Sequence, residues 1–131
     1  MKVASEIRTI EKTVNLYVEG LYERKFNLLK EAFWDKARNV GIKPQNEFWF
    51  KTMDFWEEKC KTPPDPEFMK KAEIIIEFID VWHNSAMAKV MLVVTHRERI
   101  YECMDYLSLL KIDSKWKIIS KIWSSRNILK V

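Results

Sequence analysis

Two oppositely charged residues, Asp105 and Lys121, lie inside the otherwise apolar runs of the segment DYLSLLKIDSKWKIISKIWSS, residues 105–125. An aspartate beside a lysine can act as a general base that the cation tunes, or as a charged anchor for a polar ligand. The same two residues can also form a structural cross-strand ion pair, worth about 0.2–1 kcal/mol when exposed. The sequence leaves both interpretations of Asp105 and Lys121 open.

The surroundings of this pair depend on the register of a predicted hairpin, two long strands joined by a tight turn at Asp113-Ser114. If the turn spans residues 112–114, Lys111 lies opposite Lys115 and, by counting back, Asp105 lies opposite Lys121. The predicted inner face then consists of Asp105, Leu107, Leu109, Ile119, Lys121 and Trp123. A shift of one residue would instead turn Tyr106, Ser108 and Ile118 inward.

Large apolar side chains are predicted to line a pocket beside this face. They are Leu29, Phe33, Trp34, Trp56, Met91, Leu107 and Trp123. A pocket of this kind suits a flat, mostly apolar ligand held between aromatic rings. The same side chains can equally fill the core and leave no cavity, so the hollow and the filled alternative both stay open.

Hydrophobic spacing predicts the elements that position these residues. A long amphipathic helix follows Ser5, a candidate N-cap, because apolar residues recur after it at spacings of three and four. A second helix is predicted over residues 26–33, a short strand over 37–42 and a third helix over 46–59. Strands are predicted over Ala72–Trp82, Ala86–Arg97, Ile100–Ile112 and Lys115–Trp123. Helices followed by strands in 131 residues predict one α+β domain, residues 1–131, with an antiparallel sheet.

Both faces of this predicted sheet are apolar. In its first hairpin, one face carries Ile79 and Val90, and the other carries Phe78 and Met91. The helices of so short a chain can cover only one face, so we expect the other face to meet a second copy of the chain in a homodimer. The alternative is an ordinary sheet with scattered exposed apolar residues, which protein surfaces tolerate.

Composition excludes several classes of protein. The chain is 47% hydrophobic and has a net charge of +4 spread over mixed signs, so neither disorder nor nucleic-acid binding is expected. Cys60 and Cys103 lack CxxC spacing, and no HExxH, GxSxG, P-loop or Rossmann pattern is present, so no metal or cofactor is predicted. With no signal-peptide pattern and no apolar run of about 20 residues, we expect a cytoplasmic protein without a membrane partner.

Short motifs spread along the chain carry a family resemblance. They are Tyr17-x-Glu19-Gly20-x-Tyr22, Leu29-x-x-Ala32-Phe33, Ile79-Asp80-Val81 with Ala86-x-Ala88-Lys89-Val90, and Asp105-Tyr106-Leu107-x-Leu109 with Trp116-Lys117-Ile118 and Lys121. In order and spacing, over about residues 4 to 125, the chain resembles the putative lumazine-binding and polyketide cyclase-like branch of the nuclear transport factor 2-like superfamily.

The resemblance implies a cystatin-like α+β cone, in which a strongly curved antiparallel sheet wraps around three helices and leaves an apolar pocket. It also implies sheet-mediated dimers, and the superfamily includes isomerases, dehydratases, cyclases and hydrolases beside domains that only bind. Many relatives carry a His-Pro pair where this chain has Trp34-Asp35, so a histidine acid or base is missing at that point. Ser114 replaces the usual turn glycine, and serine tolerates a left-handed conformation less well.

Three functions remain open on this basis. The first is a homodimeric domain that binds a small, largely apolar or aromatic molecule. The second is a cofactor-independent lyase, isomerase or hydrolase with Asp105 as general base and Lys121 as its partner. The third is a structural dimerisation module with a filled core.

Overall fold

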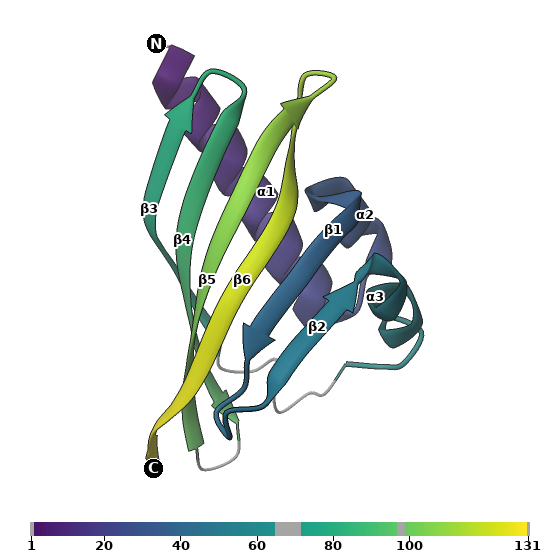
Figure 1. Cartoon of the computed structure of the whole chain (residues 1–131), viewed down its shortest axis with the longest axis vertical. Coiled ribbons are helices and arrows are strands. Elements are labelled where there is room, and N and C mark those ends of the chain that lie inside the picture. The colour runs from purple at the N-terminus through teal and green to yellow at the C-terminus, as the bar shows by residue number, and fades with distance from the viewer. Residues whose placement is uncertain (1, 65–71, 97–98, 131) are drawn as a thin grey trace.

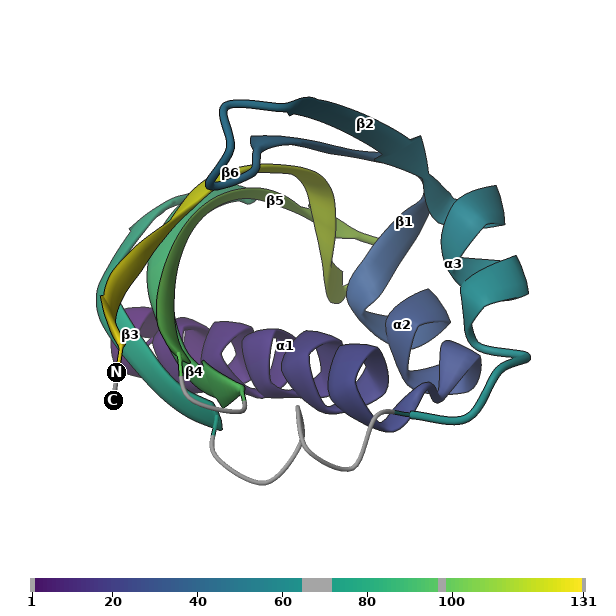
Figure 2. The same cartoon turned by 90° about the horizontal axis from the view of Figure 1, so that it is seen from below.

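A curved sheet wraps around a long N-terminal helix in the computed structural model of the chain, which describes residues 2–64, 72–96 and 99–130 (Figures 1 and 2). The helices are α1 (Lys2–Glu23), α2 (Phe26–Ala32) and α3 (Met53–Lys59). The strands are β1 (Phe33–Ile42), β2 (Phe48–Thr52), β3 (Ala72–Trp82), β4 (Ser85–His96), β5 (Arg99–Ile112) and β6 (Lys115–Lys130). The predicted α+β class is confirmed.

The strands form one sheet in the order β2-β1-β6-β5-β4-β3. All neighbours are antiparallel except β1 and β6, which run parallel. The sheet is therefore mixed, and the predicted antiparallel pairing holds except between β1 and β6. Parallel neighbours need a long connection, and here the intervening elements β2, α3, β3, β4 and β5 provide it. Figure 2 shows the sheet as an arc whose open side is crossed by α1.

Helix α1 supplies the core that the concave face covers. Ile10, Val14 and Tyr17 are buried on its inner side, as their spacing predicts. The helix begins at Lys2, so Ser5 is inside it and is not its N-cap. A β-carbon at Gly20 would lie 3.0 Å from Leu29 Cδ2, which shows why glycine suits this contact between α1 and α2.

The segment predicted as a third helix over residues 46–59 is half strand. Within β2, Trp49 is half-buried while Phe48 and Phe50 are exposed, which is the alternation of a strand. Three neighbouring aromatics fit a helix with several buried faces as well as this alternation, and pairing of β2 with β1 selects the strand. Similarly, β1 begins at Phe33 and is longer than the predicted strand over 37–42, because parallel pairing with β6 extends it.

The four C-terminal strands agree closely with the prediction, and the differences are at their ends. Strand β3 has the predicted bounds, whereas β6 continues to Lys130 along β5, beyond the predicted end at Trp123. Strand β4 ends at His96, and the predicted end at Arg97 lies outside the described residues.

The hairpin of β5 and β6 has a two-residue turn, and this corrects the predicted register. Asp113 and Ser114 both have positive φ, 48° and 68°, so Ile112 pairs with Lys115. Together with one extra residue in β6, this turn places Asp105 opposite Trp123 and not opposite Lys121. The predicted three-residue turn is wrong, because a left-handed pair closes the hairpin with two residues.

The two-residue turn reverses which side chains of β6 face inward, and a β-bulge in β6 reverses them again. Leu109 pairs with Ile118 and Ser108 pairs with Ser120, which leaves Ile119 as the extra residue of β6. Ile118 is fully buried, so it takes the inward place that was predicted for Ile119. Beyond the bulge, the inner face continues with Lys121 and Trp123, which share it with Asp105, Leu107 and Leu109.

The opposite, convex face of the sheet is largely apolar. Its exposed apolar side chains include Ile75, Phe78, Met87, Tyr106, Leu110 and Ile122, with exposed fractions between 41% and 58%. No helix of the described chain packs on this face, since α1 lies on the concave side (Figure 2).

Candidate functional site

A buried polar cluster joins α1 to the two central strands. Tyr17 Oη donates a hydrogen bond of 2.7 Å to Asp105 Oδ2 and accepts a short one from Lys121 Nζ. Lys121 Nζ lies 3.7 Å from Asp105 Oδ2, with side-chain exposures of 6% and 0%. The Tyr17 hydroxyl therefore stands between the two charges, and burial of the ion pair is compensated by a shared hydroxyl.

Cys103 extends this cluster along β5. Its Sγ lies 3.4 Å from the second carboxylate oxygen, Asp105 Oδ1, and donates to it. Burial is the largest cause, and the charge of Asp105 the second, of a rise in the pKa of the Cys103 thiol to about 12. Burial likewise raises the pKa of Tyr17 well above its ordinary value, with Asp105 as the second cause. Both groups thus stay protonated at neutral pH and act as donors to Asp105.

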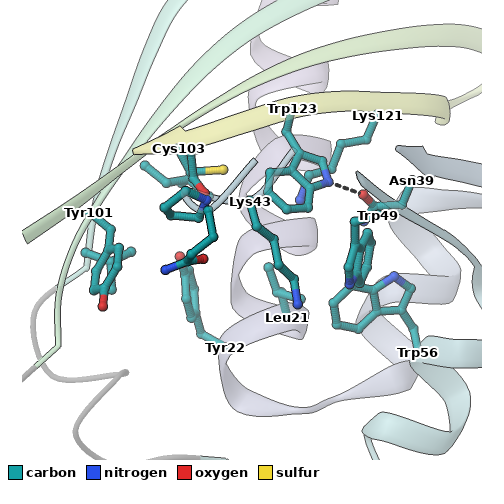
Figure 3. Close-up of a pocket in the computed structure, with 15 residues that line it drawn as sticks. Leu21, Tyr22, Asn39, Lys43, Trp49, Trp56, Tyr101, Cys103, Lys121 and Trp123 are labelled. Carbon is teal, nitrogen blue, oxygen red and sulfur yellow. Dashed lines mark hydrogen bonds between the residues drawn. The ribbon is translucent and has the colours of Figure 1, made fainter. Parts of the chain in front are cut away.

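A cavity of about 450 Å³ opens beside the cluster, between the concave face of the sheet, the end of α1 and the β1–β2 hairpin (Figure 3). Lys121 and Cys103 line it, whereas Asp105 lies behind them and does not. The remaining lining residues are mostly apolar or aromatic: Leu21, Tyr22, Asn39, Lys43, Pro44, Gln45, Trp49, Trp56, Leu92, Val94, Tyr101, Trp123 and Ser125.

Three tryptophan rings form one wall of this cavity. The Trp49 ring from β2 is central, with its centroid 5.5 Å from that of Trp123 on β6 and 5.9 Å from that of Trp56 on α3. Gly41 of β1 makes room for the Trp123 ring, because a β-carbon there would lie 2.1 Å from Trp123 Cε2. The strand–helix junction at residues 52–53 places Trp49 and Trp56 side by side, which a continuous helix would not do.

The Trp123 ring is held in place by a hydrogen bond to Asn39. Asn39 is 5% exposed on β1, and its Oδ1 accepts a hydrogen bond from Trp123 Nε1. Asn39 and Lys121 are direct partners across the parallel pairing of β1 and β6. Their side chains therefore share one wall of the cavity, as Figure 3 shows.

Comparison with known proteins bears on this arrangement. The sequence model of a family described as "Putative lumazine-binding" matches residues 5–124, nearly the whole chain. The chain belongs to this family. The resemblance expected from the sequence motifs is thereby confirmed. No curated protein matches the chain.

Similarity to solved structures identifies the fold of this putative lumazine-binding domain. A nuclear transport factor 2-like protein of unknown function from Silicibacter pomeroyi aligns with TM-score 0.76 and 23% identity, over 98% of this chain and 100% of that one. A similar protein of unknown function from Shewanella baltica aligns with TM-score 0.75 and 22% identity, over 94% and 95%. A superfamily protein from Salmonella enterica aligns with TM-score 0.66 and 16% identity, over 98% and 96%. These similarities establish the nuclear transport factor 2-like fold of the domain.

The structure brings together only part of the residue set predicted for the pocket. Trp56 and Trp123 of this set line the cavity, together with Lys121, which was predicted as the partner of Asp105. Leu29, Phe33 and Leu107 are buried in the core instead. Two further residues lie elsewhere because of strand alternation: Trp34 is 37% exposed, and Met91 points to the convex side while its neighbour Leu92 faces the cavity.

Tyr17, Asn39 and Trp49 are among the site residues that the sequence interpretation missed. Tyr17 entered it as part of a family motif and of the predicted first helix, and its hydroxyl partner lies 88 residues away. Asn39 carried a weak signal, as a polar residue in a short apolar strand. Trp49 was hidden by the helical assignment of its segment.

Among the described residues, no group of three or more His, Cys, Asp or Glu side chains is placed to hold a metal ion. Within the same residues, no helix is both long and apolar enough to cross a membrane.

Proposed function

We propose that this domain binds a small, flat, largely apolar molecule in the cavity beside Trp49, Trp56 and Trp123. The observation that carries the proposal is the cavity itself, about 450 Å³ with aromatic walls and a buried lysine. Ligand pockets commonly measure about 300–1,000 Å³ and combine apolar walls with a few placed polar groups. The family description agrees with it, since lumazine is a flat bicyclic aromatic molecule.

The same observation weighs against a filled structural module. Aromatic side chains that served only as core would close the space between them, because protein interiors pack without large voids. Here the central ring, Trp49, packs against Trp56 and Trp123, and the three rings still line an open cavity. A cavity of this size supports the binding of a small molecule over a purely structural role.

Binding is also supported over catalysis by Asp105. A general base needs to reach the proton it removes, within about 3 Å or through one water. Asp105 is fully buried behind Lys121, and its two carboxylate oxygens already accept from Tyr17 and Cys103. In the proposed function, Asp105 and Tyr17 position the Lys121 ammonium at the cavity wall.

Titration with the neutral fluorescent probe N-phenyl-1-naphthylamine tests the binding proposal. We expect saturable one-to-one binding that Trp56→Ala weakens about tenfold, because a ring wall is lost. Trp82→Ala is the matched control, since Trp82 is 78% exposed at the outer end of β3, and it should leave affinity unchanged. Absence of saturable binding, together with native mass spectrometry showing no copurified small molecule, would refute the proposal.

We further propose that the domain is a homodimer joined through the convex face. The support is the row of exposed apolar side chains on strands β3 to β6, which no described helix covers. A double substitution, Phe78→Asp with Ile122→Asp, should convert the dimer to a monomer in sedimentation-velocity analysis without changing probe binding. A monomeric wild type at high micromolar concentration would contradict this. The cytoplasmic location stays a prediction.

A further inference from the structure

We infer that the cavity selects flat aromatic acids, with the ligand's anionic oxygen held between Lys121 Nζ and the Asn39 amide. This inference rests on the proposed binding function and adds the chemical class of the ligand. It follows from the donors at one wall, from the charges around the cavity and from the shape of the remaining walls.

Lys121 has more hydrogen-bond donors than its protein neighbours use. An ammonium group carries three N–H bonds. Among the described residues, the Tyr17 hydroxyl is the one hydrogen-bond acceptor found for it, and Asp105 Oδ2 at 3.7 Å is beyond hydrogen-bonding distance. Lys121 is 5% exposed and lines the cavity, so an acceptor in the cavity would complete its bonding.

The Asn39 amide provides a second donor beside it. Trp123 Nε1 can only donate, and this fixes Asn39 Oδ1 as the atom that faces the indole. The amide nitrogen, with two N–H bonds, is thereby directed away from Trp123. Since Asn39 and Lys121 are Cα partners on adjacent strands and both line the cavity, their donors can meet one acceptor group.

The charges around the cavity favour an anion at this place. No Asp or Glu is among the described residues that line it, whereas Lys43 and Lys121 are. Asp105 balances Lys121 from the far side, with the Tyr17 hydroxyl between them, so the buried ion pair is a dipole with its positive end toward the cavity. A charge-assisted hydrogen bond is about twice as strong as a neutral one.

The other walls require the rest of the ligand to be flat and apolar. Trp49 and Trp56 provide ring faces, and Leu92 and Val94 provide an aliphatic floor from β4. An aliphatic acid would use the donors but not the rings. A neutral arene would use the rings but leave the donors without an acceptor. An aromatic acid satisfies both parts of the wall.

Two probes with the same ring skeleton separate these contributions. 8-Anilinonaphthalene-1-sulfonate carries an anionic group that N-phenyl-1-naphthylamine lacks, and displacement of one by the other shows that they share the cavity. Asn39→Asp keeps the acceptor for Trp123 but replaces the donor with a negative charge. We expect it to weaken sulfonate binding about tenfold or more, and neutral-probe binding by less than about threefold.

A second variant tests the contribution of the Lys121 ammonium to sulfonate binding. Lys121→Met combined with Asp105→Asn removes both buried charges together, so that neither is left unpaired, and the same selective loss is expected. Lys61→Met is the control, because Lys61 is a 66% exposed surface lysine, and it should change neither affinity. Equal losses for both probes in both variants would overturn the selection of acids and leave the binding proposal standing. If neither probe binds the wild type, the binding proposal itself fails.

Discussion

Removal of the Lys121 ammonium should destabilise the domain far more than loss of a surface charge. In Lys121→Met, Asp105 stays fully buried and loses its cationic partner, while Tyr17 loses the donor to its hydroxyl. Breaking a buried ion pair from one side costs about 3–5 kcal/mol, because the other charge is left uncompensated. For a domain of this size, each kcal/mol corresponds to about 4 °C, so the melting temperature should fall by about 12–20 °C.

The double variant Lys121→Met with Asp105→Asn provides the decisive comparison. Asparagine keeps an acceptor for the Tyr17 hydroxyl but carries no charge, so most of the lost stability should return. Urea unfolding at 25 °C of the wild type, both single variants and the double variant gives the coupling free energy directly. We expect a coupling of about 2 kcal/mol or more, in line with a desolvated pair.

A surface pair of the same chain calibrates this measurement. Lys61 and Glu58 are 2.9 Å apart but 66% and 74% exposed, so Lys61→Met should change stability by less than about 0.5 kcal/mol. The reasoning is refuted if Lys121→Met costs no more than Lys61→Met, or if the coupling between Lys121 and Asp105 is near zero. Either result would mean that water reaches the pair.

Other predictions test the cavity, the thiol and the anchoring of α1. Gly41→Ala should displace the Trp123 ring and reduce probe affinity, seen as a shifted tryptophan emission and weaker binding; unchanged spectra would contradict the 2.1 Å approach. With its pKa raised to about 12, Cys103 should be thiolate in only about 1 in 10,000 molecules at pH 8, so iodoacetamide should label it slowly and about tenfold faster per pH unit; rapid labelling at pH 8 would contradict this. The hydrogen bond from Lys111 lowers the pKa of Glu6, so its stabilisation is present above the ordinary value of 4.5 and is lost as pH falls through the folded value. Glu6→Gln should therefore lower the melting temperature at pH 7, and the difference from the wild type should shrink as the pH falls well below 4.5; a difference that does not change with pH would contradict it.

Local signals in the sequence were sufficient for much of the fold. The spacing of Ile10, Val14 and Tyr17 specifies a helical face, and it predicts α1 without knowledge of its partners. The β-branched runs of β3 and β4 and the Asp113-Ser114 turn are equally local. Elements of this kind are encoded within a few residues, so a single sequence reveals them.

Features that depend on distant contacts could not be predicted in this way. The segment with Phe48, Trp49 and Phe50 is compatible with a helix or a strand, and only pairing with β1 decides between them. The parallel pairing of β1 with β6 likewise joins parts of the chain about 80 residues apart. Tyr17 and Asn39 belong to the site through such contacts, which explains why the site was less predictable than the fold.

The bulge at Ile119 explains why Asp105 and Lys121 meet although the predicted register was wrong. Side chains alternate along a strand, so three residues after the inward Ile118, Lys121 would point to the convex face in a regular β6. The extra residue shifts β6 against β5, and Lys121 turns inward. On the convex face this ammonium would be solvated at little cost, whereas inside it requires Asp105, Tyr17 and a locally interrupted ladder. The proposed acidic ligand would use this inward-pointing cation, which a regular β6 would not direct at the cavity.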